Sequence, residues 1–139
     1  MVLDRGLVGE LKSIVGAEHV RTEHGDVEPF ARDATPVFRA VPDAVVWPRT
    51  AEEVAAVLRL ATARGVPVVP RGAGSNLCAA TVAERGGIVL VLTRMDQILE
   101  ISPDELLARV EAGIGSSATV TSVSTPSVPS EPVSSRVRS

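Results

Sequence analysis

The stretch VPVVPRGAGSNLCAAT, residues 66–81, determines how the rest of the chain is interpreted. A run rich in valine, residues 66–69, leads into a turn that contains Gly72 and Gly74. Because glycine has no Cβ, its backbone reaches positive φ values and lets another group approach closely. Successive N–H groups in such a turn can converge on an anion. The stretch therefore predicts a strand that leads into an anion-binding loop.

Two common phosphate-binding motifs do not fit this loop. A dinucleotide-binding G-x-G-x-x-G needs a third glycine where Leu77 stands, and a P-loop needs a Gly-Lys pair that the loop lacks. Asp96 has about the spacing of a ribose-binding carboxylate, but it follows a turn-like segment, so the match is weak. Spacing alone leaves two interpretations open. One is a pyrophosphate cradle with Ser75 and Asn76 as added donors, and the other is a tight turn that binds nothing.

Three sequence blocks decide between these interpretations by resemblance. They are PDAVVWPRTAEEV at residues 42–54, GVPVVPRGAGS at 65–75 and GGIVLVLTRM at 86–95. In this order they resemble the opening of the FAD-binding domain of the vanillyl-alcohol oxidase and p-cresol methylhydroxylase flavoproteins. Within that family they are most similar to the group of glycolate oxidase and FAD-linked D-lactate dehydrogenase. The resemblance covers roughly residues 28–114, and it is specific because the blocks occur together.

The resemblance implies FAD as cofactor and oxidation of a 2-hydroxy acid such as glycolate or D-lactate. The positions that match the pyrophosphate loop, and that we expect to bind the cofactor, are Arg71, Gly72, Ala73, Gly74, Ser75, Asn76, Leu77 and Cys78. The chain departs from the family pattern at Asn76, where glycine or serine is frequent, and at Ala79 and Ala80, where glycine is common. No catalytic base or substrate-binding arginine can be carried over, so we expect this chain alone to be inactive.

Three functional interpretations therefore compete. The first is the FAD-binding portion of a flavoenzyme that needs a missing substrate-domain chain as partner. The second is a non-catalytic remnant that keeps the early fold but does not retain flavin. The third is a general nucleotide- or phosphate-binding module.

The expected fold is α+β, the N-terminal portion of a p-cresol-methylhydroxylase-type FAD-binding domain, with a mixed sheet and flanking helices. Helical spacing of Leu3, Leu7, Leu11, Ile14 and Val15 predicts a first helix that ends at Gly16. Thr50 and Glu53 form a capping box, worth about 1 kcal/mol, for a second helix that ends at Gly65.

Short apolar runs predict the strands. They lie at residues 44–47, 67–69, 88–92, 98–101 and 106–110. The run at 88–92 is apolar throughout, which is typical of a strand buried on both faces. The group Ser102-Pro-Asp-Glu105 predicts a turn between the last two strands.

The resemblance and the change of composition near residue 115 together divide the chain into three parts. We expect an N-terminal helix and linker at 1–27, a partial FAD-binding domain at 28–114 and a disordered tail at 115–139. The tail holds nine serines, three threonines and three prolines without leucine or aromatic residues, so it cannot bury enough apolar surface to offset its ordering entropy. Because the resembling proteins continue with a second glycine-containing segment, we expect a truncated or frame-disrupted copy.

The polar segment at residues 17–40 contains His19 and His24, which invite a metal-binding interpretation. Nothing fixes them on one helical face, and a solvated loop is the favoured alternative. By resemblance, Phe30, Asp33 and Thr35 match a segment that leads into the first strand, so we expect structural entry residues, with a position near the flavin as the alternative. For Cys78 we expect a small buried hydrophobe rather than a reactive thiol.

Charge and hydropathy argue against several classes of protein. A net charge of −3 from 14 basic and 17 acidic side chains gives no basic footprint for nucleic acid, and aromatic residues make up only 2%. No apolar run approaches the roughly 20 residues of a membrane span, and the N-terminus lacks a signal-peptide core. A single cysteine fits a reducing compartment. We expect a cytoplasmic protein that binds neither nucleic acid nor a metal and has no integral membrane segment.

Overall fold

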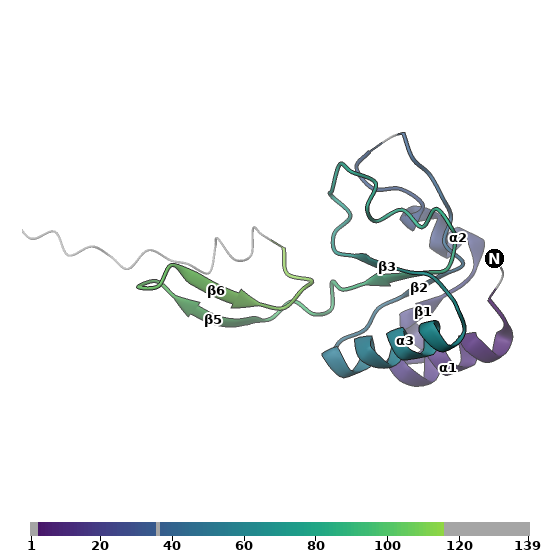
Figure 1. The fold of residues 1–139 in the computed structure, drawn as a ribbon, viewed down its shortest axis with the longest axis horizontal. Helices are drawn as coiled ribbons and strands as arrows, with labels where there is room; N and C mark the ends of the chain where they lie inside the picture. The colour runs from purple at the N-terminus through teal and green to yellow at the C-terminus, as the bar shows by residue number, and fades with distance from the viewer. Residues whose placement is uncertain (1–2, 36, 116–139) are drawn as a thin grey trace, which may run out of the picture.

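A computed structural model describes residues 3–35 and 37–115 of the chain (Figure 1). It contains a four-stranded mixed sheet with helices packed against it and a separate two-stranded hairpin. The expected fold class is therefore confirmed for the described part of the chain. The disordered tail expected at 115–139 lies, apart from Gly115, outside the described residues.

The sheet has the strand order β1-β2-β4-β3, and its bounds are β1 Val20–Arg21, β2 Ala44–Val46, β3 Val68–Arg71 and β4 Ile88–Val91. Strands β2 and β3 both run parallel to β4, which lies between them, and β1 is antiparallel to β2. The carboxyl ends of three parallel strands therefore meet at one edge. The sequence predicted β2, β3 and β4 but not their order, because a parallel strand returning from a long loop can insert anywhere in the sheet.

Alternate residues of β2 and β4 build two cores, one on each face of the sheet. Ala44, Val46, Ile88 and Leu90 pack with α1 and α3 on one face. Val45, Val89 and Val91 pack on the other face with Val27, Ala83 and partly buried neighbours. All four residues of β4 are buried, so the prediction of a strand covered on both faces is confirmed.

Both predicted long helices are present, and each ends close to the predicted glycine, but the first begins at Arg5 and leaves Leu3 outside it. Helix α1, Arg5–Val15, is capped by Asp4, whose carboxylate accepts a hydrogen bond from Leu7 N–H at 2.8 Å, and ends at Gly16. Helix α3, Ala51–Ala63, begins at Thr50 and is followed by Gly65 with φ +62°. The capping box is shifted by one residue. Thr50 accepts from Glu53 N–H, whereas Glu53 accepts from the N–H of Arg49 rather than Thr50.

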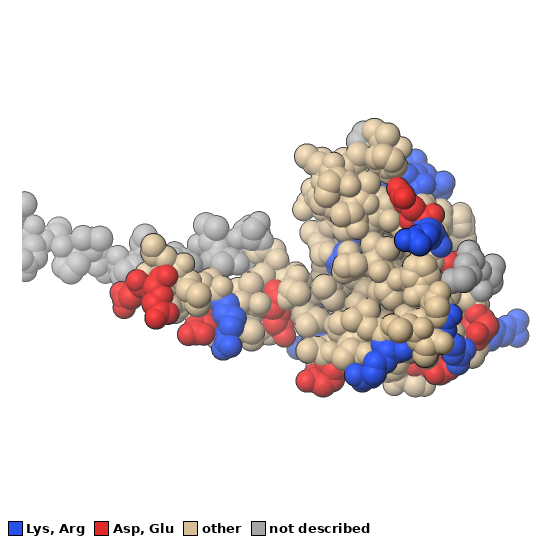
Figure 2. Space-filling view, viewed as in Figure 1, with Lys and Arg blue, Asp and Glu red and all other residues tan. Residues whose placement is uncertain are grey.

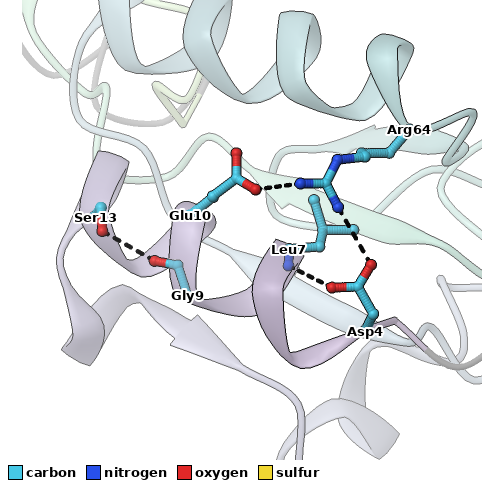
Figure 3. Close-up of polar contacts among 6 residues, drawn as sticks. All are labelled: Asp4, Leu7, Gly9, Glu10, Ser13 and Arg64. Carbon is cyan, nitrogen blue, oxygen red and sulfur yellow. Dashed lines mark hydrogen bonds and ion pairs between the residues drawn. The ribbon is translucent and has the colours of Figure 1, made fainter.

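One arginine joins the two helices. Arg64, just after α3, donates to Asp4 at 3.2 Å and also to Glu10, and both acids belong to the α1 region (Figure 3). The contact bridges 60 residues of sequence. It draws the acidic side of α1 toward α3.

The segment that was expected to be irregular contains short elements. These are the 3-10 turns Ala17–His19 and Glu28–Phe30, strand β1 and helix α2, His24–Val27. Strand β1 has two residues and forms only because it pairs with β2. Periodicity cannot detect elements this short, since tertiary contacts stabilise them.

The hairpin of β5, Ile98–Ser102, and β6, Leu107–Val110, extends away from the sheet (Figure 1). Both strands and the intervening turn are confirmed. Leu99, Leu106 and Leu107 are exposed on it. Figure 2 shows acidic side chains gathered around this arm, and Glu100, Asp104 and Glu105 lie there.

Within residues 3–35 and 37–115, no helix has the length and apolar character needed to cross a lipid bilayer.

Replacing Leu11 by alanine tests whether α1 belongs to the same cooperative unit as the sheet. Leu11 is completely buried in the core that α1 shares with β2 and β4. Leu11→Ala should lower the free energy of unfolding by about 2 to 5 kcal/mol. The matched variant Leu58→Ala, at a 42% exposed position of α3, should cost less than about 1 kcal/mol. Equal, small losses in denaturant melts would show that residues 1–27 fold apart from the sheet.

Candidate functional site

A glycine-containing loop leaves the carboxyl end of β3 and connects it to β4. The chain bends at residues 72–74, directly after the last residue of the strand, Arg71. Gly74 has φ +74°, a value that L side chains rarely adopt. Ligands of open α/β sheets bind at this edge, beyond the carboxyl ends of parallel strands.

The backbone donors of this loop have no acceptor among the residues that the structure describes. Within the described part of the chain, no N–H group from Gly72 to Cys78 donates to a protein acceptor. Backbone N–H groups require partners, so these groups bond to water or to a ligand. A bent row of unpartnered donors is the arrangement that accommodates an anion.

A buried arginine lies beneath the loop. Arg71 is 9% exposed as a whole residue, and its Nη1 donates to the carbonyl oxygen of Arg32 at 2.8 Å and to Thr81 Oγ1 at 3.4 Å. Its guanidinium carbon stands 5.5 Å from the centre of the Phe30 ring. Burial lowers the pKa of Arg71, and the Asp33 carboxylate partly opposes this change. The guanidinium stays charged, because arginine is not deprotonated in proteins.

The arginine explains why position 74 has no side chain. A Cβ built on Gly74 would overlap the Arg71 guanidinium. It would lie 2.7 Å from Nε and closer still to Cζ and Nη2. Gly72 differs, because a Cβ there meets nothing within 4 Å and its φ is not positive. Only one of the two glycines is therefore required by the protein itself.

Asn76 connects the loop to a distant segment. Its Nδ2 donates to Asp33 Oδ2 at 2.6 Å and contacts Cys78 Sγ at 3.7 Å, while its Oδ1 accepts from Thr81 Oγ1 at 3.1 Å. Asp33 in turn accepts from the backbone N–H of Thr35 at 2.8 Å. The amide of Asn76 is thus directed at protein groups, and its effect on the loop is to hold it in place.

The structure brings the segment of Phe30, Asp33 and Thr35, which was expected to lead into the first strand, close to the loop. Phe30 contacts Arg71 through its ring and meets the Trp47 ring edge-on at 5.3 Å, and Asp33 bonds to Asn76. Thr35 Oγ1 is buried without a hydrogen-bond partner among the described residues. Sequence reasoning missed the Arg32 carbonyl and Thr81, since nothing in the pattern of single residues distinguishes them.

The remaining loop residues face outward. Ala73, Ser75, Leu77 and Cys78 are exposed, and the Ser75 hydroxyl has no protein partner in the described chain. The expectation that Cys78 is a buried hydrophobe is therefore wrong. The loop lies on the surface, and within residues 3–35 and 37–115 the thiol is left exposed.

The two histidines are not brought together at one site. His19 and His24 line different cavities. No cluster of three or more metal-ligating side chains occurs among the described residues.

Comparison with known proteins identifies the fold and the cofactor class. The family model described as FAD binding domain matches residues 42–123. Glycolate oxidase subunit GlcD of Bacillus subtilis (strain 168) is 38% identical over 76% of this chain, and D-2-hydroxyglutarate dehydrogenase of Stutzerimonas stutzeri (strain A1501) is 35% identical over 80%. The chain spans only 22% and 24% of the length of these two relatives.

Solved structures agree with this assignment. The crystal structure of p-cresol methylhydroxylase with substrate bound has a TM-score of 0.76 and 25% identity, with coverage of 87% of this chain and 25% of that one. The 4-ethylphenol oxidase from Gulosibacter chungangensis has a TM-score of 0.67 and 30% identity, with coverage of 78% and 22%. The resemblance expected from the sequence is confirmed.

A strained alanine offers a test of the loop conformation. Ala79 has φ +57°, where a residue with a Cβ costs roughly 1 kcal/mol relative to glycine. Ala79→Gly should therefore raise the free energy of unfolding by up to about 1 kcal/mol. The neighbouring Ala80 does not have a positive φ, so Ala80→Gly should lower it. Denaturant melts of the two variants measure the difference, and destabilisation by both would show that Ala79 is not left-handed.

Proposed function

Since this chain belongs to the FAD-binding domain family, we propose that the loop after β3 holds the pyrophosphate of FAD. The residues assigned to this role are Arg71, Gly72, Ala73, Gly74, Ser75, Asn76, Leu77 and Cys78. The observation that carries the proposal is the row of unpartnered N–H groups from Gly72 to Cys78 above a buried cation. The sequence prediction of this cradle stays a prediction until binding is measured.

The groups present fit a diphosphate. Backbone N–H groups and the exposed Ser75 hydroxyl supply donors, and the charge of Arg71 favours an anion above it. The sequence suggested that the Asn76 amide also donates to phosphate. Because that amide is already bonded to Asp33 and Cys78, we assign Asn76 the role of holding the loop.

Bound FAD supplies the redox chemistry, because its ring system accepts a hydride and the protein contributes binding and orientation. The names of the relatives support a 2-hydroxy acid as substrate, with glycolate, D-lactate and D-2-hydroxyglutarate as candidates. The chain spans less than a quarter of the first two relatives. We therefore propose that substrate oxidation requires a partner chain that provides a substrate domain, that this chain alone is inactive, and that it resides in the cytoplasm.

One observation favours the alternative of a non-catalytic remnant. Ala79 adopts a left-handed conformation without being glycine, which adds strain next to the proposed cradle. A loop under such strain holds its phosphate-binding form less firmly.

Titration of the purified full chain with FAD distinguishes the alternatives. Saturable binding of one FAD per chain, seen as a shift of the flavin absorbance band, supports the proposal. Equal affinity for FAD, ADP and inorganic pyrophosphate would indicate a general phosphate-binding module. A folded chain that binds none of them would be the remnant.

Two glycine variants separate folding from ligand approach. Gly74→Val should both destabilise the chain and abolish FAD binding, because its side chain meets Arg71 and its φ is +74°. Gly72→Val should leave thermal stability nearly unchanged, since the space around its Cβ is open, yet it should lower FAD affinity at least about tenfold, or 1.4 kcal/mol. Unchanged FAD affinity in Gly72→Val would show that the pyrophosphate does not bind against this part of the loop.

The charge of Arg71 gives a further prediction. Arg71→Met should lower the affinity for FAD at least about tenfold while leaving that for riboflavin, which has no phosphate, unaffected. The FAD affinity of Arg71→Lys should lie between those of the unmodified chain and Arg71→Met, because lysine keeps the charge but lacks the planar fork of donors. Arg59→Met, at an exposed position of α3, is the control. Equal losses for FAD and riboflavin would mean that Arg71 acts only on folding.

A further inference from the structure

A cavity between α1 and α2 lies away from the glycine loop. Its volume is about 760 Å³, within the usual range of small-molecule pockets. Pro42 and Asp43 form part of its wall, and they precede β2. The cavity is therefore near the amino end of this parallel strand, whereas the loop after Arg71 leaves the carboxyl end of β3. We call it the α1–α2 cavity.

One face of α1 lines this cavity. Arg5, Val8, Gly9 and Lys12 recur at helical spacing and all contribute to the wall. The acids of the same region are directed elsewhere, because Asp4 and Glu10 bond to Arg64 beside α3 (Figure 3). The helix thus separates its charges, with carboxylates toward α3 and cations toward the cavity.

The basic side chains of the cavity form no ion pair in the described chain. No ion pair or side-chain hydrogen bond involves Arg5, Lys12 or His24 within residues 3–35 and 37–115. His24 lies near enough to Glu28 to help lower the pKa of that carboxyl, but the carboxylate itself is bonded to Arg39. The charges of Arg5 and Lys12 therefore stay available to a ligand.

The other polar groups of the wall complete the site. Thr22 adds a hydroxyl beside the basic side chains. The one carboxylate in the wall, Asp43, accepts a hydrogen bond from Gly87 N–H at 2.5 Å. The arrangement of two cations, an imidazole and a hydroxyl is complementary to an anion.

The rest of the wall is apolar. Leu3, Val8 and Val41 are partly exposed and contribute hydrocarbon surface, and Val27 closes the wall behind them as part of the core. Gly9 leaves the helix side of the cavity hollow, because a Cβ at this position would meet nothing within 4 Å. A ligand that fills the space therefore needs both an anionic head and an apolar body.

We infer that the α1–α2 cavity binds a small organic oxyanion with a short apolar chain, such as an aliphatic carboxylate. Arg5, Lys12 and His24 contact the oxyanion, and Leu3, Val8 and Val41 contact the chain. This site is separate from the flavin loop, so it does not depend on the proposed function.

Titration of the full-length chain with hexanoate tests the inference. Backbone amide chemical shifts of Gly9 and Gly25, which belong to α1 and α2, should move saturably with hexanoate. Hexanol, which lacks the charge, and inorganic phosphate, which lacks the chain, should each bind at least about fivefold more weakly. Equal binding of hexanol would show that the cavity does not recognise the oxyanion, which would overturn the inference. The absence of a saturable shift with hexanoate would also overturn it.

Variants assign the effect to the cavity. Lys12→Gln should weaken hexanoate binding at least about fivefold, whereas Arg59→Gln, an exposed position on α3, should not change it. Gly9→Leu should block hexanoate binding because its side chain fills the hollow. It should not destabilise α1, because leucine has a higher helix propensity than glycine. If Gly9→Leu folds and still binds hexanoate with unchanged affinity, the ligand lies elsewhere and the inference is wrong. FAD titration of Gly9→Leu should match the unmodified chain.

Discussion

The burial of the Arg71 guanidinium is the constraint on which the loop region depends. A cation can leave water only when other groups replace the interactions that water supplied. Here the carbonyl of Arg32, the hydroxyl of Thr81 and the face of Phe30 provide them. These partners come from two segments, so one side chain fixes how residues 30–35 lie against the turn after β3. The same side chain occupies the space that a Cβ at residue 74 would take, so a substitution there must displace the guanidinium.

The sheet provides the platform for that arrangement. Because β4 is covered on both faces and has a parallel neighbour on each side, the ends of β2, β3 and β4 are held in register. Trp47, at the end of β2, packs edge-on against Phe30, which in turn contacts Arg71 at the end of β3. The ends of two strands that are not neighbours are thereby connected through one aromatic pair.

The parts that could be predicted from the sequence carry their own local signals. The caps at Thr50 and Gly65, the spacing of Leu7 and Leu11, and the unbroken apolar run of β4 all led to elements at the expected places. The glycine turn was likewise visible in the sequence. By contrast, β1 and α2 exist only through pairing and packing. The bond from Arg71 to Arg32 spans 39 residues, and the exposure of Cys78 depends on which segments fail to cover it, so neither follows from local pattern.

The β5–β6 arm has a consequence for handling the protein. Two strands that stand apart from a larger sheet keep both outer edges unpaired, and such an isolated hairpin is at best marginally stable in water. Exposed leucines add an apolar surface to those open edges, while the charges of Asp104 and Glu105 oppose edge-to-edge association and Glu100 is ion-paired with Arg109 at 3.4 Å. Acid, which protonates the carboxylates of the arm, and concentrated salt, which screens them, should therefore both favour association of chains through the arm.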